Sequence, residues 1–385
     1  MVLNMEEFYI ADKVSLQTFC EKISDSEWLA IDTEFIREKT FFPNLCLIQV
    51  CNDKYAAAID PIKIKDISCL LDIIFSQKIL KIFHAGNQDL EIFFNNCKKV
   101  PTPIFDTQPA AALLGHGDQV GYANLVKSFF DIELKKDQSR TNWMARPLTK
   151  DQIRYALDDV IYLGKIYTIM KAQLSELDRL NWLNSDFDKL TDIKTYRPNP
   201  YDFWKRIKGK RNLNSRQLAT LRELAGWREE MARNRNMPRN WLAKDGILVE
   251  ISRQMPMTME DFDKLNEVAF LFSNEDKKEL IKLISIASNL SDDQLPESKS
   301  PQKRLTPQQQ AMTSFLNTCL CLIASQHKLS PQVIATNKDI QKFVLGDEAS
   351  KLNNGWRKDI AGELLNELKN GSLQLINEHG KLKIL

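Results

Sequence analysis

Three strand-forming segments follow one another closely in the first sixty residues, and this meander restricts the fold more than any other feature. They are EWLAIDTE (27–34), LCLIQVC (45–51) and KYAAAIDP (54–61), the last two joined by a tight turn. A meander followed by strand–helix alternation predicts an α/β fold with a mixed sheet flanked by helices. The elements expected after the meander are a helix near 64–76, a strand at 78–85, a helix at 87–97, a strand at 103–107 and helices at 107–114, 121–130 and 149–172.

Two acids, Asp32 and Glu34, end the first of these strands. Side chains alternate along a strand, so the two acids share one face while Thr33 points the other way. Two carboxylates about 4 Å apart at an effective dielectric near 20 repel each other by roughly 4 kcal/mol. A chain that keeps both acids therefore needs something that offsets their repulsion.

Two later segments add acids in similar structural contexts. Asp89 lies about one turn into the helix that follows the fourth strand. Tyr155 and Asp159 are four residues apart, so they share one face of the helix expected over 149–172, which opens with a capping-box pattern. Asp158 is rotated by about 100° from Asp159. We therefore select Asp159, which lies on the same face as Tyr155.

Four acids meeting at a sheet edge would be intolerable as bare charges, and divalent cations would neutralise them. Mg²⁺ and Mn²⁺ favour such oxygen ligands. Two of these ions about 3.5–4 Å apart stabilise the attacking and leaving oxygens of a phosphoryl displacement. A nearby tyrosine hydroxyl could orient the attacking water. Each motif alone is commonly a helix cap or a surface pair, so the prediction of metal-assisted phosphodiester hydrolysis depends on their joint occurrence.

Together the motifs resemble those of the four-acid (DEDD) exonuclease superfamily, in its tyrosine subgroup. The strings IFHAGNQDLEIF (82–93) and NWMARPLTKDQIRYALDDVIYL (142–163) are similar to ribonuclease D. The resemblance implies a ribonuclease H-like fold and release of nucleotides from RNA 3′ ends. It also implies that Tyr155 positions the water. One departure is Asn142, where the family pattern has an acid. The resemblance implies that two Mg²⁺ or Mn²⁺ ions are bound by Asp32, Glu34, Asp89 and Asp159.

Several residues near the motifs are candidates for RNA contact. Phe35 could stack on a terminal base, or it is a core aromatic. His84 could approach the substrate, or it is a buried histidine whose ring nitrogens are hydrogen-bonded within the protein. Asp106 is interpreted as a helix N-cap. The loop before the 149–172 helix supplies Arg140, Trp143 and Arg146. Basic residues beside an aromatic side chain suit contact with an RNA backbone. The alternative is a solvated loop whose tryptophan packs inward.

One segment carries most of the positive charge. The whole chain has a net charge of +2, whereas residues 194–244 hold 14 basic and 4 acidic residues, a net of +10. A near-neutral chain with one strongly basic segment is a candidate polyanion binder, and solvated helix faces are the plainer explanation. Residues 218–252 resemble the helicase-and-RNase-D C-terminal (HRDC) domain, an auxiliary nucleic-acid-binding module. The phosphate-contact candidates in it are Arg228, Arg233, Arg235 and Arg239.

Two polar, proline-containing stretches, 195–203 and 291–304, are interpreted as linkers. Residues 355–372 resemble a second, diverged HRDC copy without the basic excess, which we expect to shape a ring or clamp. The predicted architecture is therefore an exonuclease domain followed by two all-α domains. Their expected bounds are 1–195 for the exonuclease domain, 210–290 for the first HRDC domain and 304–385 for the second, HRDC-like domain.

The remaining features narrow the class of protein. Seven scattered cysteines without a Cys-x-x-Cys pair, together with an N-terminus lacking an apolar signal segment, predict a cytoplasmic protein, and we expect a monomer without a membrane span. The predicted activity is a 3′→5′ exoribonuclease that releases 5′-mononucleotides and trims tRNA precursors and other structured RNAs. One alternative is a DNA-directed proofreading exonuclease. The other is a nucleic-acid-binding protein whose nuclease fold has lost its activity, and the retained acids disfavour this second alternative.

Overall fold

The computed structural model describes residues 5–135, 138, 141–297 and 305–385. It divides into a larger unit (Met1–Phe35, Leu45–Ile193 and Leu305–Leu385) and a smaller unit (Ile36–Asn44 and Lys194–Arg304). Among the described residues, no helix combines the length and apolar character that crossing a membrane requires.

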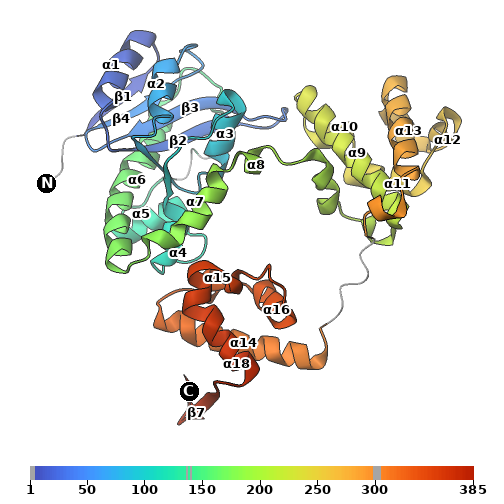
Figure 1. Ribbon diagram of the computed structural model, residues 1–385. Coiled ribbons are helices and arrows are strands. Elements are labelled where there is room, and N and C mark those ends of the chain that lie inside the picture. The colour runs from blue at the N-terminus through green and yellow to red at the C-terminus, as the bar shows by residue number, and fades with distance from the viewer. Residues whose placement is uncertain (1–4, 136–137, 139–140, 298–304) are drawn as a thin grey trace. The chain divides into compact units, whose positions relative to one another are not determined.

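A six-stranded sheet forms the centre of the larger unit (Figure 1). Its strand order is β1-β4-β3-β2-β5-β6. The pairs β1–β4, β2–β5 and β5–β6 are parallel whereas β3–β4 is antiparallel, so the predicted mixed sheet is confirmed. The strands are β1 (Glu6–Ile10), β2 (Trp28–Ile36), β3 (Asn44–Cys51), β4 (Tyr55–Ile59), β5 (Leu80–Phe83) and β6 (Ile104–Asp106).

Helices cover the sheet, with α1 and α2 on one side and α5 and α6 on the other (Figure 1). The long helix α6 begins as expected, because the Thr149 side chain accepts from the Gln152 backbone while the Gln152 side chain accepts from the Thr149 backbone. The α-helices of the sheet-containing part are α1 (Lys13–Ile23), α2 (Ser68–Ile74), α3 (Asn87–Cys97), α4 (Thr107–Leu113), α5 (Tyr122–Phe130), α6 (Lys150–Glu176) and α7 (Asn184–Thr191).

The C-terminal part of the larger unit is mainly helical, and it contacts the sheet-containing part through aromatic and basic side chains. The rings of Trp182 and Trp356 stack with centroids 4.5 Å apart at an interplanar angle of 3°. Arg179 donates to the His327 carbonyl oxygen at 2.8 Å. The C-terminal elements are α14 (Pro307–Gln326), α15 (Pro331–Ile334), α16 (Asn337–Leu345), α17 (Gly355–Arg357), a π-helical turn (Lys358–Gly362), α18 (Glu363–Asn370), β7 (Leu375–Glu378) and β8 (Lys381–Ile384).

The smaller unit has an all-helical core built around Trp227, Leu248 and Phe262. Part of the predicted 195–203 linker is folded: residues Pro200–Arg206 form a 3₁₀ helix that packs on α9. Gly226 permits this packing, since a Cβ there would lie 2.7 Å from the Tyr201 ring. The α-helices are α8 (Ile193–Tyr196), which starts at the boundary of the units, α9 (Ser215–Asn234), α10 (Arg239–Leu242), α11 (Asp245–Gln254), α12 (Met259–Asp263) and α13 (Asn274–Ser288).

Candidate active site

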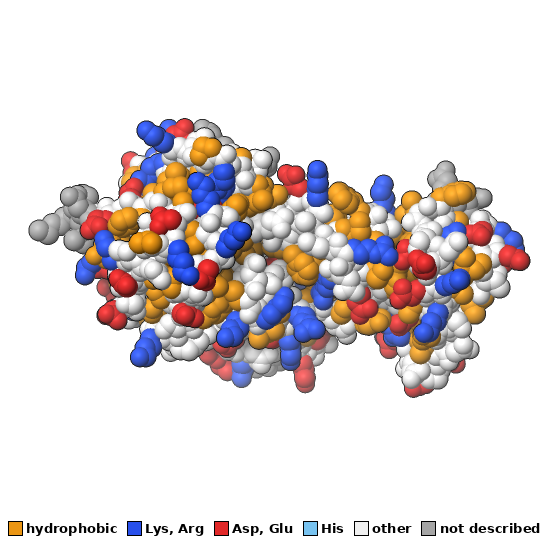
Figure 2. Space-filling view, turned by 90° about the horizontal axis from the view of Figure 1, so that it is seen from above, with side chains coloured by type: hydrophobic (Ala, Val, Ile, Leu, Met, Phe, Trp, Pro, Cys, Tyr) orange, Lys and Arg blue, Asp and Glu red, His pale blue; other side chains and the backbone are white. Residues whose placement is uncertain are grey.

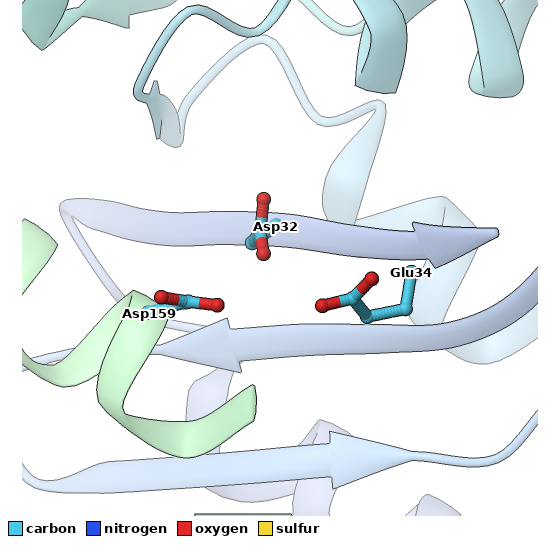
Figure 3. A group of neighbouring side chains, drawn as sticks. All are labelled: Asp32, Glu34 and Asp159. Carbon is cyan, nitrogen blue, oxygen red and sulfur yellow. The ribbon is translucent and has the colours of Figure 1, made fainter. Parts of the chain in front are cut away.

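Three of the four predicted acids converge at the sheet. Asp32 and Glu34 extend from β2, and Asp159 faces them from α6 (Figure 3). Each offers a carboxylate oxygen, and these three oxygens lie within 4.8 Å of one another. The alternation along β2 and the position of Asp159 on α6 therefore bring together residues more than 120 positions apart in the chain.

Burial and nearby acids raise the pKa of all three carboxyl groups. Burial and the charges of Asp32, Asp159 and Asp89 raise the pKa of Glu34 to about 10. Burial and neighbouring acids raise the pKa of Asp159 to about 8, and burial and Asp159 place that of Asp32 well above its usual range. A cluster that resists ionisation in this way fits an oxygen-binding divalent cation, which removes the repulsion.

Asp89 lies beside this trio but outside their mutual 4.8 Å range. It occupies the first turn of α3 and is buried. Burial and the charge of Asp32 raise its pKa, which shows that it belongs to the same electrostatic cluster. The Thr33 hydroxyl donates to Asp89 Oδ1 at 2.5 Å.

Tyr155 lies where the helix spacing predicted, on the face of α6 that carries Asp159. Its hydroxyl forms a hydrogen bond with the Asp159 carboxylate, and burial together with the acids raises the pKa of Tyr155 above its usual range. The phenol therefore stays protonated at neutral pH and can donate to the carboxylate. The Trp143 ring packs beside Tyr155, with centroids 6.2 Å apart.

Asp106 holds the turn that leads into α3. Its carboxylate accepts from the backbone N–H of Gln108, which confirms the predicted N-cap of α4. It also accepts from the N–H groups of Ala85 and Gly86, each at 2.9 Å. Gly86 packs so closely that a Cβ would lie 2.5 Å from Phe83 Cβ. The carboxylate of Asp106 thus fixes the start of the helix that carries Asp89.

His84 has both ring nitrogens occupied. Nδ1 pairs with the Thr107 hydroxyl at 2.9 Å, and Nε2 pairs with the Val120 carbonyl oxygen at 3.1 Å. Burial lowers the pKa of His84 to about 4, so the ring is neutral at physiological pH. This environment corresponds to the alternative to a substrate contact, a buried histidine whose ring nitrogens are hydrogen-bonded within the protein. Tyr122, which sequence reasoning missed, packs on this ring and donates to the Asp158 carbonyl oxygen at 2.8 Å.

The loop before α6 is held in place by contacts with the rest of the protein. Trp143 is 2% exposed, which corresponds to the inward-packed alternative. The Arg146 guanidinium donates to both carboxylate oxygens of Asp60, at 2.6 and 2.9 Å, and to the Cys46 carbonyl oxygen. These contacts correct the RNA-contact interpretation of both residues, because the Trp143 ring is buried and the Arg146 guanidinium is engaged by Asp60 and Cys46. Arg140 lies outside the described residues.

The four candidate arginines of the smaller unit all approach acids. Arg228 is 3% exposed and donates to Asp245 and the Ala243 carbonyl oxygen, which corrects its interpretation as a phosphate contact. Arg235 pairs with Asp276 at 2.8 Å. Figure 2 likewise shows basic side chains interspersed with acidic ones over the visible face. The buried carboxylate of Glu229 lies 3.8 Å from Arg233 and 3.5 Å from Arg239.

Two family models match the chain. A 3′-5′ exonuclease model matches residues 8–175, which include the acids and Tyr155. An HRDC domain model matches residues 217–269, within the smaller unit.

The chain is also similar to known proteins along nearly its whole length. It is 36% identical to "Ribonuclease D" of Zymomonas mobilis, over 97% of this chain and 96% of the relative. It is 35% identical to "Ribonuclease D" of Sphingobium indicum, over 97% of both chains. Among solved structures, it resembles that of Escherichia coli RNase D, described as an exoribonuclease involved in structured RNA processing. The TM-score is 0.77 at 31% identity, covering 95% of this chain and 99% of the other.

Proposed function

This chain belongs to the ribonuclease D family of 3′→5′ exoribonucleases, and we propose that Asp32, Glu34, Asp89 and Asp159 bind two divalent metal ions, Mg²⁺ or Mn²⁺. The observation that carries this proposal is the approach of three carboxylate oxygens to within 4.8 Å of one another. Such ions, when bound, stabilise the attacking and leaving oxygens at phosphorus.

The remaining chemistry is assigned to Tyr155. Its hydroxyl hydrogen is engaged by Asp159, which leaves the oxygen lone pairs free to accept a hydrogen bond from the attacking water. A water held in this way is oriented toward the terminal phosphodiester bond of an RNA 3′ end. The products are a 5′-mononucleotide and an RNA shortened by one residue.

The proposed substrates are tRNA precursors and other structured RNAs, in keeping with the activity described for the Escherichia coli protein. Phe35, which is partly exposed next to Glu34, would stack on the terminal base. Arg235 and Arg239, whose side chains are 43% and 40% exposed, would contact phosphates. We retain His84 and Arg233 as weaker candidates, because internal contacts already engage both side chains.

We further propose the domain bounds 1–195, 210–290 and 304–385, and a cytoplasmic monomer. The likeness to an HRDC model over 217–269 supports the middle domain. Size-exclusion chromatography with light scattering tests the monomer, for which the expected mass is that of one 44.5 kDa chain.

The central test follows the digestion of a tRNA precursor transcript carrying a 3′ extension. With Mg²⁺ or Mn²⁺ the enzyme should release 5′-mononucleotides, and chelation of the metal should stop the release. Asp32→Asn and Asp159→Asn should each lower the rate by more than about 100-fold, since even residues that only orient metal ligands contribute 10–100-fold.

Asp158→Asn is the matched control, because Asp158 adjoins Asp159 but pairs with Arg154 at 2.8 Å. It should retain most of the activity. Undiminished hydrolysis in chelator, or in both ligand variants, would refute the metal assignment. Faster digestion of DNA of the same sequence would favour the proofreading alternative. Binding of RNA without hydrolysis would favour a binding protein whose nuclease fold is inactive.

A further inference from the structure

Thr33 lies between two proposed metal ligands, yet its side chain is turned to the opposite face of β2. On that face it is 5% exposed. A buried hydroxyl that lacks a hydrogen-bond partner costs free energy, so its surroundings must supply one. The partner is Asp89, whose Oδ1 accepts the Thr33 hydroxyl at 2.5 Å.

The hydrogen bond links two separate elements of the fold. Thr33 belongs to β2 and Asp89 to the first turn of α3, 56 residues further along the chain. In the described part of the chain, Thr33 is the side-chain hydrogen-bond partner of Asp89. A hydroxyl–carboxylate bond of this length lies in the range of strong, charge-assisted hydrogen bonds.

This contact helps to set the orientation of the Asp89 carboxylate. Oδ1 is held by the Thr33 hydroxyl, and the backbone N–H groups of Thr33 and Asp89 also donate to the carboxylate, so its plane cannot rotate freely. Orientation matters more for Asp89 than for the other acids, since Asp32, Glu34 and Asp159 already lie within 4.8 Å of one another whereas Asp89 stands outside that group.

We propose that Thr33 is a positioning residue of the metal centre, whose hydroxyl fixes the orientation in which the Asp89 carboxylate meets a divalent cation. The inference rests on the metal-binding role proposed above for Asp89. Groups that orient metal ligands through hydrogen bonds typically contribute 10–100-fold to metal affinity or activity.

The test measures Mn²⁺ binding to the full-length, RNA-free protein by titration calorimetry. Thr33→Val removes the hydroxyl at nearly constant volume and should weaken Mn²⁺ binding by about 10-fold or more. Thr33→Ser keeps the hydroxyl and should remain within about 3-fold of the wild type. Thr33→Ala, a second variant that does not depend on the valine being accommodated, should lose affinity as Thr33→Val does. Thermal melting monitors folding of each variant.

Thr313→Val is the matched control. Thr313 is also 5% exposed, and its hydroxyl donates to the Gln309 carbonyl oxygen in α14. This variant should bind Mn²⁺ as the wild type does. In an Asp89→Asn background Thr33→Val should cause no further loss, because Thr33 acts through Asp89.

Wild-type affinity in Thr33→Val, failure of Thr33→Ser to restore binding, or additive losses in the double variant would each overturn the inference. The proposed metal centre fails separately: in that case the wild-type protein itself binds no Mn²⁺, or Asp89→Asn binds it unchanged.

Discussion

At the scale of single residues, buried polar groups determine how the acids are held. Thr33 engages Asp89, Asp106 ties down the turn before α3, and the Tyr122 hydroxyl donates to the backbone beside Asp159. His84 adds a further tie through the Val120 carbonyl oxygen. Buried hydrogen bonds of this kind are costly to break singly, because the remaining partner is left unsatisfied.

The buried imidazole of His84 makes the stability of the protein depend on pH. Burial lowers its pKa from 6.5 to about 4, so the unfolded chain binds this proton more readily than the folded one. The contribution is complete above pH 6.5 and is lost as the pH falls toward 4. At pH 5 the expected loss from this group is about 2 kcal/mol of unfolding free energy. Chemical denaturation at pH 7 and pH 5 measures it when the wild type is compared with a variant that lacks His84, because the buried acids contribute equally to both proteins.

Relative to the wild type, His84→Gln should gain about that 2 kcal/mol of unfolding free energy on going from pH 7 to pH 5, because the variant lacks the loss caused by His84. His379→Gln serves as the control, because His379 is exposed in the β7–β8 turn and its replacement should leave the wild-type dependence intact. The same change in stability between pH 7 and pH 5 for His84→Gln and the wild type would contradict this account of His84.

Residues with a local signal were the ones that sequence reasoning could find. Strand alternation identified Asp32 and Glu34, and four-residue helix spacing paired Tyr155 with Asp159. The partnership of Thr33 with Asp89 joins positions far apart in the sequence, and no spacing rule reveals it. The same holds for Arg146, whose ionic partner Asp60 is 86 residues away. The parts of the site that depend on hydrogen bonds between residues distant in sequence were therefore the ones that could not be predicted.

At the scale of elements, the sequence prediction omitted strand β1, helix α1 and the hairpin β7–β8. The strand β1 was overlooked because it begins with two glutamates and forms an edge of the sheet, where charged residues are common. Helix α1 was missed with it. The C-terminal hairpin β7–β8 was expected to be helical. Its turn holds His379 and Gly380 at φ of 53° and 84°, the left-handed conformation that tight hairpins require, and the glycine was its one local signal.

The contact between α17 and the 3₁₀ helix Leu180–Leu183 stabilises the larger unit. Trp356 is 8% exposed and stacks on Trp182, and Arg179 and Arg357 lie over the two rings. Trp356→Ala should lower the unfolding free energy by on the order of 3 kcal/mol and make residues 305–385 easier to release by limited proteolysis. Trp241→Ala, at a tryptophan that is 60% exposed, should change neither.

If Trp356→Ala melts like the wild type and resists protease equally, the aromatic stack is not what holds the C-terminal helices. A lower melting temperature without new cleavage would instead place the effect within the core of those helices.

At the scale of the whole molecule, the fold serves to gather acids from β2, α3 and α6. Most of the mixed sheet and its helices could be predicted from apolar strand and helix patterns, and the resemblance in sequence extends over nearly the full length. The +10 segment could be located by counting charges, but its arginines are organised around Glu229, Asp245 and Asp276. Charge totals indicate a polyanion binder and do not say which guanidinium groups remain available.

The most direct measurement is a crystal structure of the protein grown with Mn²⁺, in which anomalous scattering locates the ions. We predict two manganese peaks, contacted by carboxylate oxygens of Asp32, Glu34, Asp89 and Asp159, with the Tyr155 hydroxyl facing the same space. A map without anomalous density at these side chains, or one in which their carboxylates point apart, would contradict the account.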